Sequence, residues 1–126
     1  MPRTITLEFP IPDMQKSSIH GNGNRFAKAK TIKQLRGGAT WTVLNKYNGV
    51  RLGNRCLISY RFYVPDKRRR DEANMIQACK PFIDGIVDAK LISGDHWEVL
   101  SIIGVETKVD RERPRVEIVI TEEIAF

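Results

Sequence analysis

The chain has 126 residues and carries 21 lysines and arginines against 15 aspartates and glutamates, a formal net charge of +6 at pH 7. This length predicts one domain spanning residues 1–126 with a single modest core, and a hydrophobic content of 41% argues against wholesale disorder. The positive charge favours a polyanionic partner such as nucleic acid. No apolar run approaches the roughly 20 residues of a membrane span, and the N-terminus lacks the apolar segment of a signal peptide. We therefore expect a cytoplasmic protein with no membrane partner.

The first predicted element is a half-buried strand over residues 4–10, in which Ile5, Leu7 and Phe9 point one way. Residues 11–24 are polar and glycine-rich, which predicts a loop. Helical spacing follows over residues 25–36, is weakened or broken at Gly37-Gly38, and resumes over residues 39–47. One flank of this helix is cationic, with Arg25, Lys28, Lys30, Lys33 and Arg36. These cations form either a solvated face or contacts to a phosphate backbone.

The clearest strand covers residues 55–64 and is stopped by Pro65. Helical spacing then covers residues 75–90, where Pro81 cannot donate a backbone hydrogen bond and predicts a kink or a second helix. Two more strands are predicted over residues 96–105 and 115–120, with the charged residues 106–114 as a hairpin tip. The order strand, helix, strand, helix, strand, strand predicts an α+β fold. In it a mixed or antiparallel sheet of about four strands packs with two main helices.

Several classes of site find no support in the sequence. Cys56 and Cys79 lie in apolar-patterned segments without C-x-x-C spacing or a close histidine, which predicts two reduced core thiols rather than a disulfide or a zinc site. There is no G-x-x-x-x-G-K-[ST] and no G-x-G-x-x-G, so no nucleotide cofactor is expected. There is also no nucleophile elbow to suggest covalent serine catalysis.

The residues that could carry chemistry gather between residues 65 and 97. Four consecutive cations at the strand-to-helix junction run straight into an acid: Lys67, Arg68, Arg69, Arg70 and then Asp71. A second acid, Asp95, follows a Ser93-Gly94 turn beyond the helix. Carboxylates that hold a divalent cation, next to cations that hold phosphate, are the two halves of a metal-dependent nuclease site. Within the helix, Lys80 could bind the scissile phosphate.

Each of these residues also has a purely structural interpretation. Asp71 could cap the helix, with Asn74 three residues later. Asp95 could serve a tight turn, and Lys80 could pair with Asp84 four residues on. The basic run could be a solvated charged segment, and Trp97 is expected to pack in the core rather than stack on a base.

Three runs in this region resemble the RusA family of Holliday junction resolvases: P-D-K-R-R-R-D-E-A-N from residue 65, K-P-F-I-D-G-I-V-D-A-K-L-I from residue 80, and G-D-H-W from residue 94. That family consists of small dimeric, magnesium-dependent endodeoxyribonucleases common in phages and prophages. The resemblance implies a RusA-like domain, a bacterial or phage-encoded source, and Mg²⁺, or Mn²⁺ in its place, as cofactor. It further implies four-way junctions or other branched DNA as substrate, and a homodimer, whose twofold symmetry suits a junction cut on two opposed strands.

The resemblance also implies roles for individual residues. The family motif is an arginine-rich run into Asp-x-Asp-Asn, which Asp71 and Asn74 match, but Ala73 stands where the second aspartate belongs. Alanine cannot ligate a metal, so either Glu72 or Asp84 replaces it, or the site binds metal with fewer ligands, or catalysis is impaired. The implied catalytic residues are Asp71, Asp95 and Lys80, and the candidate metal ligands are Asp71, Asp95, Glu72 and Asp84. The candidate DNA-binding residues are Lys67, Arg68, Arg69, Arg70, Asn74, Arg25, Lys28, Lys30 and Lys33.

Two functions follow from these observations. The first is a Mg²⁺-dependent, structure-selective endodeoxyribonuclease that cuts Holliday junctions in recombination and repair. The second is a non-catalytic basic DNA-binding or recombination accessory protein, which the alanine at position 73 keeps open.

Overall fold

The fold is organised by one mixed sheet of four strands. The computed structural model describes residues 2–12, 25–53 and 55–123. The strands are β1 (Thr4–Phe9), β2 (Cys56–Val64), β3 (Leu100–Val109) and β4 (Arg115–Glu122). They lie in the order β1-β4-β2-β3. β4 pairs antiparallel with β1 and β2, whereas β2 and β3 run parallel.

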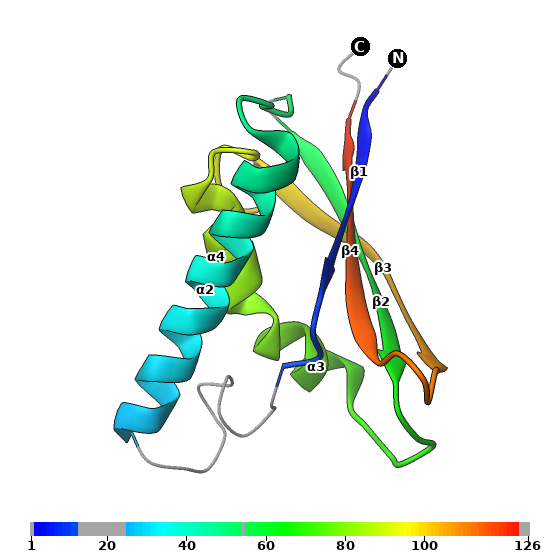
Figure 1. Cartoon of the computed structure of the whole chain (residues 1–126). Coiled ribbons are helices and arrows are strands. Elements are labelled where there is room, and N and C mark those ends of the chain that lie inside the picture. The colour runs from blue at the N-terminus through cyan, green and yellow to red at the C-terminus, as the bar shows by residue number, and fades with distance from the viewer. Residues whose placement is uncertain (1, 13–24, 54, 124–126) are drawn as a thin grey trace.

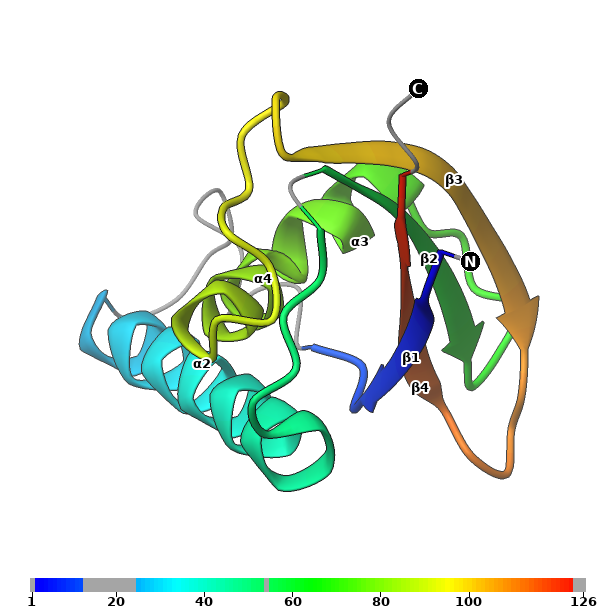
Figure 2. The same cartoon turned by 90° about the horizontal axis from the view of Figure 1, so that it is seen from above.

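Three helices lie on one side of this sheet and leave its other face open (Figures 1 and 2). They are α2 (Arg25–Tyr47), α3 (Glu72–Ala78) and α4 (Lys80–Asp88). The expectation of a single α+β domain with a four-stranded sheet and two main helices is confirmed. The predicted loop over residues 11–24 falls mostly on residues 13–24, which lie outside the described residues.

Alternation along the strands decides which face is covered. In β1, Ile5, Leu7 and Phe9 are buried and the residues between them are exposed, as predicted. β2 alternates between buried and half-buried over all nine residues. The helices complete the core, where the ring of Phe82 on α4 stacks on Phe9 with centroids 4.6 Å apart. An antiparallel sheet with one covered and one solvated face produces this pattern.

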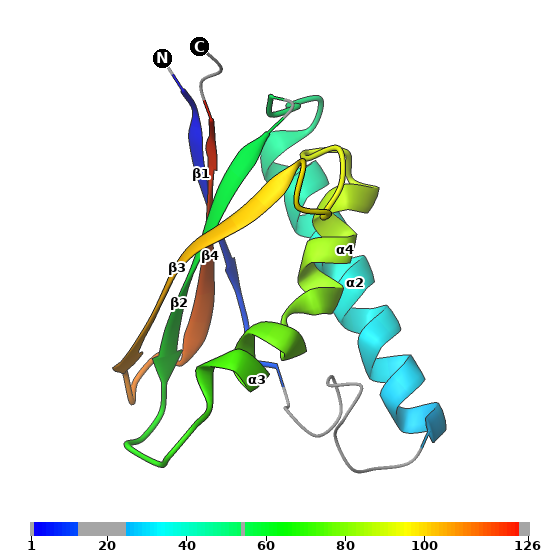
Figure 3. The same cartoon turned by 180° about the vertical axis from the view of Figure 1, so that it is seen from behind.

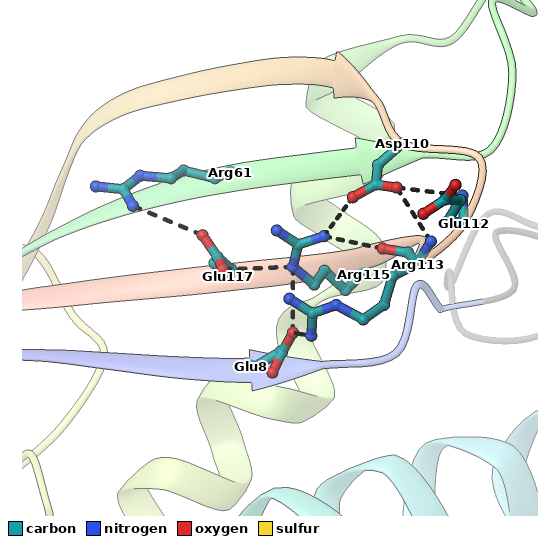
Figure 4. Close-up of polar contacts among 7 residues, drawn as sticks. All are labelled: Glu8, Arg61, Asp110, Glu112, Arg113, Arg115 and Glu117. Carbon is teal, nitrogen blue, oxygen red and sulfur yellow. Dashed lines mark hydrogen bonds and ion pairs between the residues drawn. The ribbon is translucent and has the colours of Figure 1, made fainter.

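The open face of the sheet carries a network of paired charges (Figure 4). Its members are Glu8, Arg61, Asp110, Glu112, Arg113, Arg115 and Glu117. Arg115 donates to Asp110 at 2.9 Å, approaches Glu8 at 3.1 Å and lies 3.9 Å over the ring of Tyr63. Arg61 reaches Glu117 at 3.6 Å. Neighbouring carboxylates therefore neutralise these arginines, so this part of the open face offers little free positive charge to a polyanion.

β3 differs from the prediction in position and in partner. A strand was expected over residues 96–105 and a hairpin tip over 106–114, but β3 extends from Leu100 to Val109 and β2 separates it from β4. The hairpin prediction is therefore wrong. β3 is an edge strand, and its residues from Val105 to Val109 are all exposed. Because it has no buried face along this length, its charged residues resembled those of a loop.

The long helix α2 runs without a break through Gly37-Gly38, where a weak point was predicted. Each glycine in a helix interior costs about 1 kcal/mol relative to alanine. α2 packs along α4 (Figures 1 and 3). Ala39 and Val43 of α2 are buried, and this burial offsets the cost of the glycines. A Cβ atom on Gly85 of α4 would lie only 2.3 Å from the carbonyl oxygen of Arg36. Tertiary packing thus overrides local propensity.

The predicted break near Pro81 is confirmed. α3 ends at Ala78, and α4 begins at Lys80 with Pro81 in its first turn, where the missing N–H costs nothing. Cys56 and Cys79 are buried free thiols, as expected, and burial raises the pKa of Cys79 to about 12. No helix in the described ranges combines the length and the apolar character needed to cross a bilayer.

Candidate active site

The loop that carries the basic run is organised around Asp66. Its Oδ1 accepts hydrogen bonds from the backbone N–H of Arg68 and from Nη2 of Arg70, both at 2.9 Å. Arg70 also donates through Nη1 to the carbonyl oxygens of Asp66 and Arg68. The hydrogen bond from the Arg68 backbone, together with those from Arg70, lowers the pKa of Asp66, which therefore stays ionised at neutral pH. Arg70 is thus a structural residue of this loop.

The other three cations of the run are available to a partner. Lys67 and Arg69 are exposed and form no ion pair or hydrogen bond with another described residue. Arg68 lies 3.2 Å from Asp66, but 77% of its side chain is exposed. The run therefore divides into one arginine that shapes the loop and three cations that can meet phosphate.

Asp71 caps α3. Its backbone is extended, and its Oδ1 accepts a hydrogen bond from the backbone N–H of Ala73 at 2.9 Å. Its carbonyl oxygen accepts from the N–H of Met75 at 3.1 Å, as the first bond of the helix. The structural interpretation of Asp71 as a cap is therefore confirmed. Asn74 is exposed on the first turn of the same helix.

Asp71 and Glu72 line one side of a cavity of about 590 Å³, called here the Asp71 cavity. The Glu72 carboxylate accepts a hydrogen bond from the hydroxyl of Thr107 on β3 at 2.5 Å. Lys67 and Arg68 form another part of the lining. This cavity therefore combines carboxylates with cations, but Glu72 and Asp71 each already have a hydrogen-bond donor.

Lys80 contacts two acids, one on its own helix and one in the loop that follows it. Its ammonium lies 2.9 Å from Oδ1 of Asp84, one turn along α4, and also contacts Oδ2 of Asp95 from the loop after α4. All three side chains line a cavity of about 490 Å³, called here the Lys80 cavity. Lys80 is about half exposed, whereas Asp84 and Asp95 are 29% and 39% exposed. Because both carboxylates contact one ammonium, they lie within reach of a single cation.

Asp71 and Asp95 line different cavities. Asp71 and Thr107 line the Asp71 cavity, whereas Asp95 and Ile102 line the Lys80 cavity. At about 3.3 Å per residue, roughly 16 Å of β3 separates Thr107 from Ile102. Neither of these two cavities is lined by both acids, so the structure gives no support to one ion held by both acids of one chain.

The acids that do converge are Asp84 and Asp95. Within the described part of the chain, no cluster of three or more histidines, cysteines, aspartates or glutamates is placed to hold a metal ion. Mg²⁺, however, keeps several waters and is often bound through only one or two carboxylates. The donor set at the Lys80 cavity, two carboxylates that already hold a cation, fits that requirement. Glu72 and Asp71 are not in this set.

The cations of α2 are divided in the same way as those of the basic run. Arg36 forms a two-bonded ion pair with Asp88 on α4, at 2.5 and 2.8 Å, and helps to hold the two helices together. Lys28, Lys30 and Lys33 form no ion pair with another described residue. The side chain of Arg25 lies outside the described residues. In the described part of the chain, three lysines of this flank of α2 thus have no acid paired with them.

Three site features were not anticipated from sequence. Tyr60 and Gln77 line the Lys80 cavity, although Tyr60 occupies an ordinary position on the buried face of β2 and Gln77 carries no motif. Only the folded arrangement distinguishes them from their neighbours. Trp97 lies in the loop after α4, two residues beyond Asp95, and is 76% exposed. The expectation that it packs in the core is therefore wrong.

Comparison with other proteins adds no relative to this picture. A scan against models of known protein families finds no match to the chain, and a search of curated proteins also finds none.

Proposed function

We propose that this protein is a Mg²⁺-dependent endodeoxyribonuclease that cuts branched DNA, including four-way junctions, in recombination and repair in the cytoplasm. The observation that carries the proposal is the contact of Lys80 with Asp84 and Asp95 in the lining of one cavity. Two carboxylates that can hold a divalent cation, beside an ammonium that can meet phosphate, suit metal-assisted phosphodiester hydrolysis. Mn²⁺ is expected to replace Mg²⁺.

Asp84 and Asp95 are the residues that would hold the ion. A bound divalent cation neutralises charge that develops on the phosphate oxygens and lowers the pKa of the attacking water. Lys80 has three ammonium donors, of which two meet the carboxylates. The third is available to a phosphate oxygen, so Lys80 can position the scissile group beside the two acids. Ala73 is then no obstacle, because the ligands come from α4 and the loop after it.

Free positive charge flanks this site. Lys28, Lys30 and Lys33 lie on α2, whose residue Ile32 lines the Lys80 cavity. Lys67 to Arg69 lie at the Asp71 cavity or beside it. Except for Arg68, which pairs with Asp66, these cations have no ion-pair partner among the described residues. They support binding of the DNA arms through phosphate contacts, which recognise shape rather than sequence. The arginines of the open face, by contrast, are paired with carboxylates.

The proposal includes a homodimer paired along the free edge of β3. Four apolar residues of this strand are exposed: Ile102, Ile103, Val105 and Val109. An exposed apolar edge of this kind is a template for another strand. Antiparallel pairing of two copies about Thr107 sets Val105 opposite Val109. The same register sets Glu106 opposite Lys108. The twofold axis makes the apolar pair of Val105 with Val109 and the ion pair of Glu106 with Lys108 each occur twice in the dimer.

Charge reversal tests this interface. Glu106→Lys is expected to turn a dimer into a monomer in analytical ultracentrifugation, because it sets like charges opposite each other. The double variant Glu106→Lys with Lys108→Glu is expected to restore the dimer. A dimer that survives the single change, or a double variant that stays monomeric, would exclude this register.

The nuclease proposal is tested with a labelled four-way junction. Cleavage is expected with Mg²⁺ or Mn²⁺, to stop with EDTA, and to fall by at least about a hundredfold in Asp95→Asn and in Asp84→Asn, because each loses an anionic ligand. Glu98→Gln is the control, since Glu98 is exposed in the same loop as Asp95 and forms no ion pair or hydrogen bond with another described residue. Its cleavage rate should stay near that of the original protein.

The second candidate function is a DNA-binding accessory protein without catalysis. The cap formed by Asp71 favours it, because that acid already has a structural role. Tight junction binding with no cutting under any divalent metal, and unchanged by Asp95→Asn, would establish this second function in place of the first.

A further inference from the structure

The lining of the Lys80 cavity is largely apolar, which neither a phosphate group nor a metal ion requires. Its apolar walls come from separate elements, among them Ile32 of α2, Ile76 of α3, Ile83 of α4 and Ile102 of β3. The charged trio of Lys80, Asp84 and Asp95 contributes only one part of the lining. A volume of about 490 Å³ lies within the range of about 300–1,000 Å³ typical of small-molecule sites. The ligand that this site suits therefore has a substantial apolar body.

Tyr60 supplies an unused polar group to this cavity. The residue is only 3% exposed, yet its hydroxyl makes no hydrogen bond with any described residue. Among the described side chains, no fully buried nitrogen or oxygen lacks a partner, so the Tyr60 hydroxyl reaches the cavity surface. Burial raises the pKa of Tyr60, which keeps the phenol neutral and able to donate. The hydroxyl is therefore free to donate a hydrogen bond to a molecule in the cavity.

Gln77 adds a second unused group. Its side chain is half-buried on α3 and lines the same cavity, and its amide forms no hydrogen bond with another described residue. An amide offers a donor and an acceptor side by side, which is the pattern that reads the edge of a nucleobase. The cavity therefore combines apolar walls with a phenol and an amide, next to a lysine suited to phosphate.

We propose that the Lys80 cavity binds one unstacked nucleobase of the DNA strand at the branch point, next to the phosphate held by Lys80. A base has flat apolar faces and a polar edge, which match the isoleucine walls and the pair formed by Tyr60 and Gln77. Taking a base out of a duplex costs a few kcal/mol, and least where it is already unpaired or poorly stacked. The cavity would thus favour branched DNA over plain duplex and read the base beside the cut. This inference rests on the proposed nuclease function.

Binding measured in EDTA tests the pocket independently of cleavage. The substrate is a four-way junction with each of the four bases, or an abasic site, at the branch-point nucleotide. The original protein is expected to prefer one base by about 3- to 10-fold, the worth of one hydrogen bond, and to bind the abasic junction more weakly still. Tyr60→Phe and Gln77→Leu should each reduce the preference among bases. Tyr63→Phe is the control, because Tyr63 lies on the opposite face of β2 beneath Arg115.

The melting temperature of Tyr60→Phe shows whether a loss of base preference comes from misfolding of the variant. Tyr60→Phe should leave the melting temperature unchanged or raise it, because the lost hydroxyl has no partner in the free protein. A fall in melting temperature would overturn the inference, since it would reveal a structural partner for that hydroxyl. Competition by a free nucleoside monophosphate as effective as that by the junction would also overturn it, by assigning the pocket to a small molecule.

The failures of the two proposals are distinguishable. A protein that cuts junctions with Mg²⁺ but binds all four bases and the abasic site equally refutes the base pocket alone. A protein that discriminates bases through Tyr60 but never cuts supports the pocket and refutes the nuclease. Loss of base preference in Tyr63→Phe as well as in Tyr60→Phe would overturn the assignment to this cavity.

Discussion

Replacing Gly85 by alanine is expected to destabilise the protein, because this glycine lies where α4 packs on α2. The added methyl group would lie 2.3 Å from the carbonyl oxygen of Arg36 and 2.7 Å from the Cβ atom of Ala39. Carbon atoms in contact need about 3.5–4.0 Å, so α4 has to move away from α2 by roughly 1 Å. The same movement stretches the hydrogen bond that the Thr40 hydroxyl donates to the Gly85 carbonyl, now 2.9 Å long.

The loss of stability in Gly85→Ala depends on which atom the added methyl group clashes with. Overpacking of a core costs about 1–3 kcal/mol, and the upper part of that range applies because a backbone carbonyl cannot rotate aside as a side chain does. The higher helix propensity of alanine stabilises the folded protein by at most about 1 kcal/mol relative to glycine. We expect a net loss of about 2 kcal/mol. For a chain of this length that lowers the melting temperature by about 6–10 °C.

Urea unfolding followed by circular dichroism measures this change directly. Gly38→Ala, on the facing helix, is the matched control, because a Cβ atom there meets nothing within 4 Å. It should stabilise the protein by up to about 1 kcal/mol. Gly85→Ala should also slow junction cleavage, since α4 carries Lys80 and Asp84 whereas Asp95 comes from a different segment. Equal stabilisation by both substitutions would refute the close approach of α2 and α4.

Three further predictions concern single side chains. Asp71→Ala should lower the free energy of unfolding by about 1 kcal/mol, whereas Asp71→Asn, which can still cap α3, should largely preserve it; equal losses in urea would contradict the capping role. Arg69→Ala should weaken junction binding and reduce the slope of log affinity against log salt by about one. Arg113→Ala, paired with an acid on the open face, should leave that slope unchanged, and an unchanged slope in both would argue against a phosphate contact at position 69. The hydrogen bond from Arg3 lowers the pKa of Glu122 from its ordinary 4.5 to about 2, so the stability from this pair is complete above pH 4.5 and is lost as the pH falls toward 2. Glu122→Gln should therefore make acid unfolding less steep in that interval, and an identical pH profile would count against the ion pair.

The placement of Lys80 ties the fold to the proposed chemistry. Asp84 is held one helical turn from Lys80, but Asp95 reaches it only because the chain turns back after α4 toward the start of β3. Any change that moves α4 relative to that turn therefore alters the distance between the two carboxylates. A substitution at Gly85 should therefore lower both the stability and the rate of cleavage. A substitution at Tyr60 should not change these two quantities together.

Much of this fold is determined by local sequence. The alternation of residues 4–9 and 56–64 predicts two strands with one buried face, because side chains of a strand point to opposite faces at a period of two. Pro81 predicts the boundary between α3 and α4, because a proline lacks the backbone N–H that a helix interior needs. The buried thiols of Cys56 and Cys79 follow from the apolar pattern around them. These features depend on residues within a few positions of each other.

Only the tertiary structure decides the rest. The parallel pairing of β3 with β2, and the insertion of β2 between β3 and β4, leave no local pattern, because an exposed edge strand has no buried face to mark it. The sequence predicts that acids, a lysine and arginines lie near one helix. The cap formed by Asp71 and the pairing of Lys80 with Asp84 are local and were among the interpretations of the sequence, whereas the contact of Lys80 with Asp95 depends on the tertiary structure. The sequence also does not distinguish the hydroxyl of Tyr60 from that of any other buried tyrosine. Contacts between distant segments depend on how the chain returns on itself, and residue type and spacing do not encode that path locally.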